Sequence, residues 1–370
     1  MVRETTGRPT GISAAQARPP EGTRPPRRDP GLRSSLRGDR CRPPHHGAGV
    51  RHPPAGDRQA TVDGVIPEAL ARNARQVWGA DGVRWLTELP RVLAEVAADW
   101  ELTVGEPFDL SFHYVTAVTC ADGRPAVLKL GVPSGESLRT EAAALTAFAG
   151  RGAVRLLRAD LDRAALLLER AEPGWRLRDL VPGRDAEATT VAAELLRRLA
   201  VPAPADCPLP DLSSYIAGFD DYLAVWGEDG PLPADLVGRA GGLMRELCAS
   251  APERVVLHGD LHHDNILRAE REPWLAIDPH GLVGDPGFEV GALLYNPEPG
   301  DRDPALTALV PARVEQLADL LAMPVDRVVG WGFVMAVLSD VWTAEDWKPG
   351  DRSPASRGLD VARLLLPRLG

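Results

Sequence analysis

Apolar residues recur at helical spacing from Pro67 onward, where the first regular pattern of the chain begins. The spacing of three and four residues is typical of amphipathic helices. Pro90 falls inside this run and predicts an interruption, because proline removes a backbone donor and clashes with the preceding turn. The apolar positions are Leu70, Ala74, Val77, Trp78, Val83, Leu86, Val92, Leu93 and Val96.

The pattern then changes to short apolar runs that are typical of strands. Residues 112–118 and 126–130 flank Asp122-Gly123, a dipeptide that favours a tight hairpin turn. A helix is expected over residues 138–148, followed by strands at 154–157 and 165–168.

Beyond the polar connection at residues 169–174, amphipathic helices predominate, as at 186–199 and 236–248. The pattern therefore predicts an α+β protein with two lobes. We expect a small strand-rich N-terminal lobe over residues 64–170 and a larger helical C-terminal lobe over 171–370.

Residues 1–63 differ from the rest of the chain in composition. The first sixty residues contain ten Pro, eight Gly and 12 Arg without apolar periodicity, which predicts a disordered tail. Such a basic segment could bind nucleic acid or address an organelle, but its prolines and five acidic residues oppose an amphipathic targeting helix. A start of the native protein near Val62 or Val65 is a further hypothesis.

Charge and size narrow the class of protein. The 370 residues are 44% hydrophobic, which is enough for a full core. The first sixty residues carry +7 of a formal net charge of −10, so the remainder carries −17. A body this acidic is a poor nucleic-acid binder and is suited to cationic ligands.

Cysteine spacing and hydropathy indicate the compartment. No apolar run reaches the length of a membrane span, and no secretory signal stands at the N-terminus. The cysteines lack C-x-x-C spacing, which argues against a disulfide framework or a zinc knuckle. We therefore expect a cytoplasmic protein that does not bind membranes; its cysteines are Cys41, Cys120, Cys207 and Cys248.

The segments 255–267 and 274–279 carry the chemistry. In each, an apolar strand-like run leads into a polar loop. Asp260 can accept a proton from a hydroxyl group, Asn265 can turn its amide oxygen to a metal, and Asp278 can bridge Mg²⁺ to phosphates. An Asp, an Asn five residues later and a second Asp after the next strand form the order found in kinases.

Lys129 and Glu141 complete this pattern upstream. Lys129 ends an apolar strand and can reach nucleotide phosphates, while Glu141 lies in the following helix and can pair with it. Taken alone, either residue could be a solvated surface charge.

The chain resembles the aminoglycoside phosphotransferases, nearest to their streptomycin 6-kinase and hydroxyurea phosphotransferase branch. The resemblance is carried by the loop 258–265, His-Gly-Asp-Leu-His-His-Asp-Asn, and by the run 277–289 that contains Asp278. It extends over roughly residues 65–370 through the segments 102–105, 126–133, 152–157 and 166–170 and through Trp331-Gly332.

This resemblance implies a protein-kinase-like fold that uses ATP and Mg²⁺ to phosphorylate a hydroxyl group of a streptomycin-like aminoglycoside, conferring antibiotic resistance. It implies that Asp260 is the catalytic base and that Asn265 and Asp278 bind magnesium. It further places Lys129 and its partner Glu141 at the phosphates and assigns the adenine-binding hinge to Glu169, Arg170 and Ala171.

Two departures from the family pattern stand out. No G-x-G-x-x-G precedes Lys129, and residues 109–114 occupy that place. His280 stands where the family leads us to expect a lysine.

The acceptor remains the most open part of the prediction. Residues 339–347 combine three carboxylates with two tryptophans, which suits a guanidinium or ammonium group. Asp340, Glu345 and Asp346 are therefore candidates for binding a cationic acceptor, although a solvated helix end explains them equally well. The acceptor hydroxyl, the choice between ATP and GTP, and the choice between monomer and dimer are left undetermined.

Three other functions are compatible with parts of the sequence. A kinase of a non-antibiotic metabolite would need the same catalytic residues. A nucleotide-binding module without activity would need only some of them. A metallohydrolase could use His258, Asp260, His262 and His263, although no second His and carboxylate set at ligand spacing is found.

Overall fold

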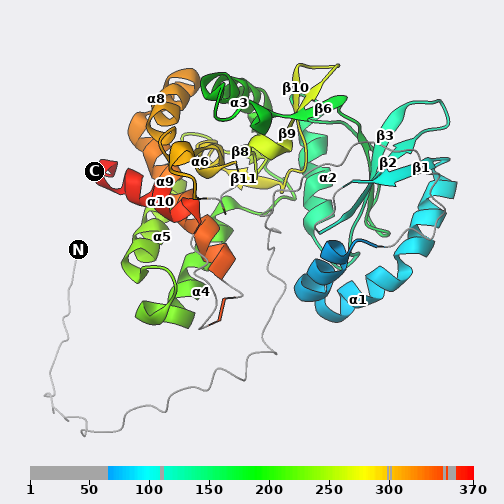
Figure 1. Ribbon diagram of the computed structural model, residues 1–370, viewed down its shortest axis with the longest axis horizontal. Helices are drawn as coiled ribbons and strands as arrows, with labels where there is room; N and C mark the ends of the chain where they lie inside the picture. Colours follow the sequence, from blue (N-terminus) through cyan, green and yellow to red (C-terminus); the bar gives the residue numbers. More distant parts are fainter. Residues whose placement is uncertain (1–65, 109–111, 298–299, 301, 345–346, 349–355) are drawn as a thin grey trace, which may run out of the picture. The chain divides into compact units, whose positions relative to one another are not determined.

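The computed structural model describes residues 66–108, 112–297, 300, 302–344, 347–348 and 356–370 (Figure 1). All of these belong to one compact unit, Cys41–Gly370. The predicted tail at 1–63 lies outside the described residues.

An antiparallel sheet of five strands forms the N-terminal lobe, in the order β1-β2-β3-β5-β4. The expected hairpin is β2 and β3, which confirms the turn at Asp122-Gly123. The two helices of this lobe, α1 and α2, lie beside the sheet (Figure 1). The elements are α1 (Glu68–Asp99), β1 (Thr103–Pro107), β2 (Tyr114–Thr119), β3 (Pro125–Leu130), α2 (Ser137–Phe148), β4 (Leu156–Asp160) and β5 (Ala165–Glu169).

Strand alternation divides the sheet into two faces. Ala126, Leu128 and Leu130 pack with α1 in one apolar cluster, because successive side chains of a strand point to opposite faces. Val127 packs against the other cluster, which contains the apolar residues of α2. Lys129 shares the face of Val127 and is thereby directed toward α2.

The first helix differs from the expectation in the place of its break. The helical assignment runs through Pro90, whereas the non-helical conformation lies at Gly79, with φ 53° and ψ −123°. L side chains rarely adopt this backbone conformation, so glycine permits the turn there.

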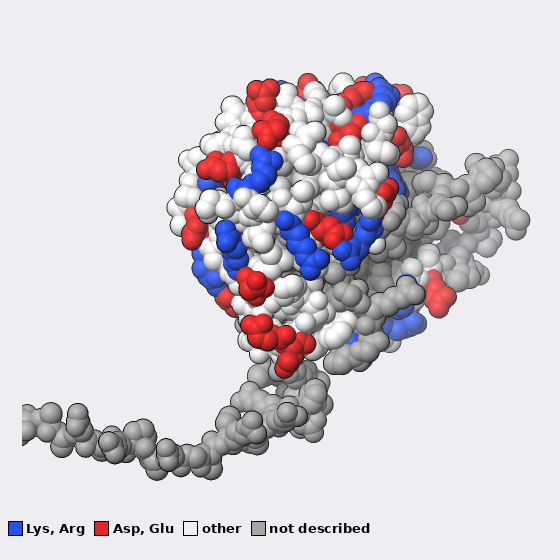
Figure 2. Space-filling model, turned by 60° about the vertical axis from the view of Figure 1, so that its left-hand side comes forward, with Lys and Arg blue, Asp and Glu red and all other residues white. Residues whose placement is uncertain are grey.

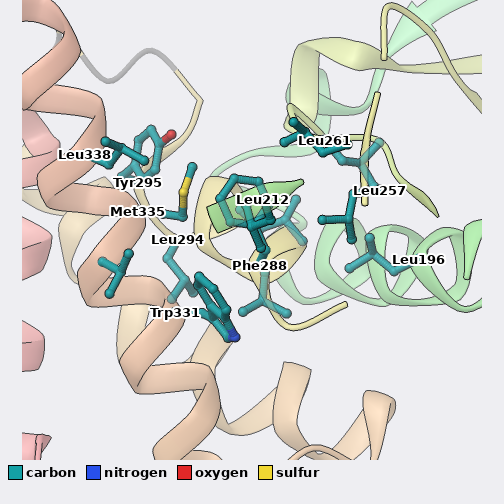
Figure 3. Packing of buried hydrophobic residues seen from close by; sticks show 14 of the residues in the cluster. Leu196, Leu212, Leu257, Leu261, Phe288, Leu294, Tyr295, Trp331, Met335 and Leu338 are labelled. Carbon is teal, nitrogen blue, oxygen red and sulfur yellow. The ribbon is translucent and has the colours of Figure 1, made fainter. Parts of the chain in front are cut away.

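The C-terminal lobe is built around the buried helix α9. This helix contacts α4, α5, α6, α8 and α10, and Trp331 and Met335 of α9 pack with Phe288 and Leu294 of α6 (Figure 3). The helices are α3 (Asp185–Leu199), α4 (Ile216–Trp226), α5 (Ala234–Ala249), α6 (Phe288–Tyr295), α7 (Pro304–Thr307), α8 (Val310–Leu321), α9 (Val325–Ala344) and α10 (Arg357–Leu365), with short 3-10 turns η1 (Leu177–Leu180), η2 (Leu212–Tyr215), η3 (Gly227–Asp229), η4 (His263–Asn265) and η5 (Leu366–Arg368).

Two small antiparallel sheets hold the loops that the sequence singles out. Their strand orders are β10-β9-β6 and β11-β8-β7. Leu257 and Leu261 flank the loop that contains Asp260 and belong to the main apolar cluster (Figure 3). Their packing anchors both ends of this loop in the core. The strands are β6 (Pro173–Arg176), β7 (Val201–Pro202), β8 (Val255–Leu257), β9 (Ile266–Ala269), β10 (Trp274–Ala276) and β11 (Leu282–Gly284).

Charged side chains are mixed on the face shown in Figure 2, where Lys and Arg alternate with Asp and Glu. Among the described residues, no helix combines the length and apolar character that crossing a membrane requires.

Candidate active site

Three charged residues from different elements, Lys129, Glu141 and Asp278, lie in contact with one another through Lys129. Its Nζ lies 2.6 Å from Oε2 of Glu141, on α2, and also donates to Oδ1 of Asp278, which follows β10. Lys129 is only 4% exposed. The strand, the helix and the loop therefore bring together three of the residues that the sequence predicts.

The two carboxylates keep Lys129 charged. Burial by itself disfavours the ammonium form, but the charges of Asp278 and Glu141 outweigh it and raise the pKa of Lys129. The positive charge is consequently maintained at neutral pH.

The loop that carries Asp278 packs closely against α2. Gly281 has φ +74°, and a Cβ on it would lie 2.5 Å from the carbonyl oxygen of Thr140. Only glycine allows this approach, and it places the loop beside the residue that precedes Glu141. Asp278 itself adopts φ 60°, a conformation that Asp tolerates better than most residues.

Asp260 lies in the loop after β8, with its side chain 20% exposed. Asn265 donates from Nδ2 to the Asp260 backbone oxygen at 3.0 Å and to Oδ2 at 3.3 Å. Nε2 atoms of His262 and His280 lie 3.5 and 3.7 Å from the same Oδ2. The structure thus brings Asp260, Asn265 and His280 together around one carboxylate.

Both ring nitrogens of His258 form hydrogen bonds with backbone atoms. Its Nδ1 accepts from the Asp260 amide at 3.3 Å, so Nε2 donates to the Ile277 carbonyl at 2.9 Å. Burial lowers the pKa of His258 to about 4, and the ring is neutral at neutral pH.

A hydrolytic metal site finds no support here. In the part of the chain that the structure describes, no group of three His, Cys, Asp or Glu is arranged to hold a metal ion. The His258, Asp260, His262 and His263 cluster of the metallohydrolase alternative does not form a ligand set of that kind.

The donor chemistry at Asn265 and Asp278 fits magnesium. The amide nitrogen of Asn265 is used by Asp260, so the amide oxygen is the atom left to bind a ligand. An amide oxygen and a carboxylate are hard oxygen donors of the kind that Mg²⁺ prefers.

Glu289 of α6 contacts the loop that contains Asp260. Its Oε1 accepts a hydrogen bond of 3.1 Å from the amide of Gly259. Burial raises the pKa of Glu289 to about 7, and the nearby Asp260 charge adds to this, although backbone hydrogen bonds oppose it. An acidic residue within the apolar run 288–295 is the sequence signal for this buried contact.

Buried charges also fix both ends of α6. Before the helix, Asp285 accepts from the amide of Gly287 at 2.8 Å and from Trp331 at 2.9 Å. At the C-terminal end of the helix, Arg313 donates to the carbonyls of Leu293 and Asn296 at 2.6 and 2.7 Å. Glu289 is therefore carried by a well-anchored helix.

The predicted hinge begins at the end of β5. The carboxylate of Glu169 is held by Arg271 at 2.7 and 2.8 Å, so its side chain contacts protein. Arg170 and Ala171 follow as partly buried residues. Nothing in the sequence around Arg271, which reads Glu-Arg-Glu, indicates this contact.

The predicted acceptor residues are only partly described. Glu345 and Asp346 lie outside the described residues. Asp340 is 1% exposed, and its Oδ1 accepts from the Ser356 amide at 3.0 Å. Burial raises the pKa of Asp340 to about 6. This contact precedes α10, and a role of Asp340 toward an acceptor stays a prediction.

Residues 100–347 match the family of aminoglycoside/hydroxyurea antibiotic resistance kinases. The chain belongs to this family. The family resemblance expected from the sequence is thereby confirmed, and the kinase transfers phosphoryl groups.

Two relatives extend the match over most of the kinase. It is 38% identical over 315 residues to a hydroxyurea phosphotransferase from Kitasatospora aureofaciens, covering 82% of this chain and 87% of the relative. It is 34% identical over 314 residues to a streptomycin 6-kinase from Streptomyces glaucescens, covering 81% and 95%.

The fold of the kinase is also found in a solved structure of an amicoumacin kinase in complex with AMP-PNP, Ca²⁺ and Ami. The TM-score is 0.53 at 14% identity, with 78% of this chain and 95% of the other covered. The protein-kinase-like fold class is confirmed, with its strand-rich and helical lobes.

Proposed function

We propose that this kinase transfers the γ-phosphoryl group of ATP to a hydroxyl group of a streptomycin-like aminoglycoside. The observation that carries the proposal is the meeting of Lys129, Glu141 and Asp278 beside the loop of Asp260 and Asn265. A relative named streptomycin 6-kinase, 34% identical, supports the acceptor class. An antibiotic-resistance role follows from that acceptor.

Asp260 acts as the catalytic base. Its Oδ2 receives a hydrogen bond from Asn265, which orients the carboxylate, while the 20% exposure of the side chain leaves room for an acceptor hydroxyl. The carboxylate orients this hydroxyl in line with the phosphoryl group and accepts its proton as transfer proceeds.

Lys129 binds the nucleotide phosphates, and Glu141 holds it in place. A charged, buried lysine provides fixed positive charge near developing negative charge without reorganisation. Asn265 and Asp278 hold magnesium, which when bound neutralises charge on the phosphates. The backbone of residues 169–171 binds the nucleobase.

A cationic acceptor is bound by carboxylates at the end of α9, with Asp340, Glu345 and Asp346 as candidates. The acidic body of the chain, −17 beyond the first sixty residues, favours such a ligand. We also propose a cytoplasmic location, because ATP is available there.

Hydroxyurea is a second candidate acceptor. The relative named hydroxyurea phosphotransferase has the higher identity of the two, at 38%. The same catalytic residues would serve, because the acceptor pocket and not the phosphoryl-transfer machinery selects between the two.

The test is an acceptor panel assayed with purified enzyme, ATP and Mg²⁺. Streptomycin, other aminoglycosides and hydroxyurea are compared by ADP release and by mass spectrometry of the products. We expect a mass increase of one phosphoryl group on streptomycin. Phosphorylation of hydroxyurea alone would select the second candidate, and no product with any acceptor would reject the substrate class.

A further inference from the structure

One arginine of the β9–β10 hairpin binds the strand that leads into the predicted hinge. Arg271 lies in the turn of this hairpin and is 21% exposed. Its side chain makes five hydrogen bonds, which equals the number of N–H donors in a guanidinium group. The donor capacity of Arg271 is thus fully used.

The partners of Arg271 belong to the N-terminal lobe as well as to its own hairpin. Nε and Nη2 donate to the two oxygens of Glu169 at 2.7 and 2.8 Å. Nη1 and Nη2 also reach the carbonyls of Gly150 and Ala153 at 2.7 and 2.9 Å, and Nη1 donates to Glu272 at 2.8 Å. A single side chain therefore joins the end of β5 and the connection between α2 and β4 to the sheet of the C-terminal lobe.

Backbone hydrogen bonds run beside this contact. The amide of Ala276, on β10, donates to Gly152 at 2.8 Å, and the amide of Val154 donates to Ala276 at 3.0 Å. Ala153 thereby forms a parallel bridge with Ala276 of β10, and β4 begins two residues later than the apolar pattern at 154–157 suggests. Residues 150–154 are therefore held both by the side chain of Arg271 and by the backbone of β10.

The carboxylate of Glu169 accepts hydrogen bonds from Arg271 and from the backbone amide of Arg155. Burial would raise its pKa, but hydrogen bonds from Arg271 and from the amide of Arg155, the latter at 2.9 Å, outweigh burial and lower it. Glu169 is ionised at neutral pH and directed at the protein. In a hinge made by residues 169–171, the backbone is left to contact a nucleobase.

We infer that Arg271 is a positioning residue for the nucleotide, because it fixes Glu169 and thereby the backbone of Arg170 and Ala171. The inference rests on the proposed function, in which these residues bind the base. A bidentate ion pair fixes direction as well as distance. Hydrogen bonds to a base weaken steeply when donors and acceptors lose alignment, so loosening this strand end reduces binding of the base.

The phosphate part of the nucleotide provides an internal reference. It is bound by Lys129 and the magnesium ligands, none of which contacts Arg271 in the hydrogen bonds described above. Loss of Arg271 should therefore weaken binding of a nucleotide but leave binding of an inorganic polyphosphate unchanged. General damage to the fold would weaken binding of both ligands.

The experiment measures binding of Mg-ADP and of Mg-tripolyphosphate to the full-length protein by calorimetry. Arg271→Met is the main variant, and Arg271→Lys keeps the charge without the planar fork. Arg268→Met is the matched control, because Arg268 lies in the same hairpin and, among the described residues, its polar and cation–π contacts stay within this hairpin, at the Pro273 carbonyl and the Trp274 ring.

We expect Arg271→Met to raise the Kd of Mg-ADP on the order of tenfold, as when one charge-assisted contact is lost, with an unchanged Kd for Mg-tripolyphosphate. Arg271→Lys should be intermediate, and Arg268→Met should match wild type for both ligands. If Arg271→Met does not fold, the same comparison is made with Arg271→Lys.

Equal Mg-ADP affinity in wild type and the Arg271 variants overturns the inference alone. So does an equal loss for Mg-ADP and Mg-tripolyphosphate, or a similar loss in Arg268→Met. Wild-type protein that binds no Mg-ADP or Mg-ATP overturns the proposed function and the inference that rests on it.

Discussion

The loops after β8 and β10 and the C-terminal end of α9 both present aspartates, but the structure surrounds these aspartates differently. Asp260 and Asp278 keep 20% and 26% of their side chains exposed and face nitrogen atoms of Asn265 and Lys129. Asp340 is 1% exposed and accepts a backbone amide.

This difference separates carboxylates that can meet a ligand from one that is already used by the fold. Burial raises the pKa of a carboxyl group, whereas neighbouring cations and donors favour its ionised form. A group that must accept a proton or bind a metal needs an accessible, ionised oxygen. The comparison predicts that substitutions in the two loops have large effects on turnover. Substitution of Asp340 is expected to affect both the KM for the acceptor and the stability of the fold.

The largest effect is expected at the residues that we propose bind magnesium. Asp278→Ala should abolish turnover at any accessible Mg²⁺ concentration, because it removes the charged ligand, whereas Asn265→Ala should raise the Mg²⁺ requirement. Titration of activity with Mg²⁺ at saturating ATP measures both. Titrations like that of wild type in both variants would contradict this assignment.

Asp260→Asn is expected to lower kcat on the order of 10² or more, because the amide has the shape of the carboxylate but cannot accept the proton. Binding of Mg-ADP should be retained. Asp162→Asn, at an exposed position between β4 and β5, is the control for the same chemical change. Turnover close to wild type in Asp260→Asn would reject the base.

Glu289→Gln tests the contact between Glu289 and the loop of Asp260 through pH. Burial raises the pKa of Glu289 to about 7 from an ordinary value of 4.5, so the folded protein holds this proton more tightly than the unfolded chain. The stability from this group is complete below about pH 4.5 and is lost as the pH rises through 7.

Between pH 5 and 8 the wild type should accordingly lose about 2 kcal/mol of unfolding free energy relative to Glu289→Gln. Denaturant unfolding of both proteins at the two pH values provides the measurement. Parallel pH dependences would show that Glu289 does not titrate in this range.

The smallest kinetic effect is expected for the acceptor residues. If Asp340 and Glu345 bind a cationic acceptor, Asp340→Ala and Glu345→Ala should each raise the KM for streptomycin tenfold or more, which corresponds to roughly 1.5 to 3 kcal/mol, without changing the KM for ATP.

The buried contact with Ser356 adds a second expectation for Asp340 alone, namely a lower Tm in Asp340→Ala. A lower Tm with an unchanged streptomycin KM would assign Asp340 to the fold. Unchanged KM values in both variants would reject the acceptor site.

Local patterns determined much of this protein from the sequence. The apolar runs at residues 112–118 and 126–130, separated by Asp122-Gly123, predict the hairpin, because this dipeptide favours a tight turn between two strands. The order of Asp260, Asn265 and Asp278 predicts the loops of the candidate site, since Asp260 follows β8, Asn265 directly precedes β9 and Asp278 follows β10.

Only the tertiary structure decided which charges are buried and what they contact. Arg271 looks like a solvated turn residue, yet its guanidinium joins Glu169 and Gly150, more than a hundred positions away in sequence. Asp340 looks like an exposed helix residue, yet it holds the backbone that precedes α10. Such contacts depend on how distant segments pack, and the local pattern of apolar and polar residues carries no record of that packing.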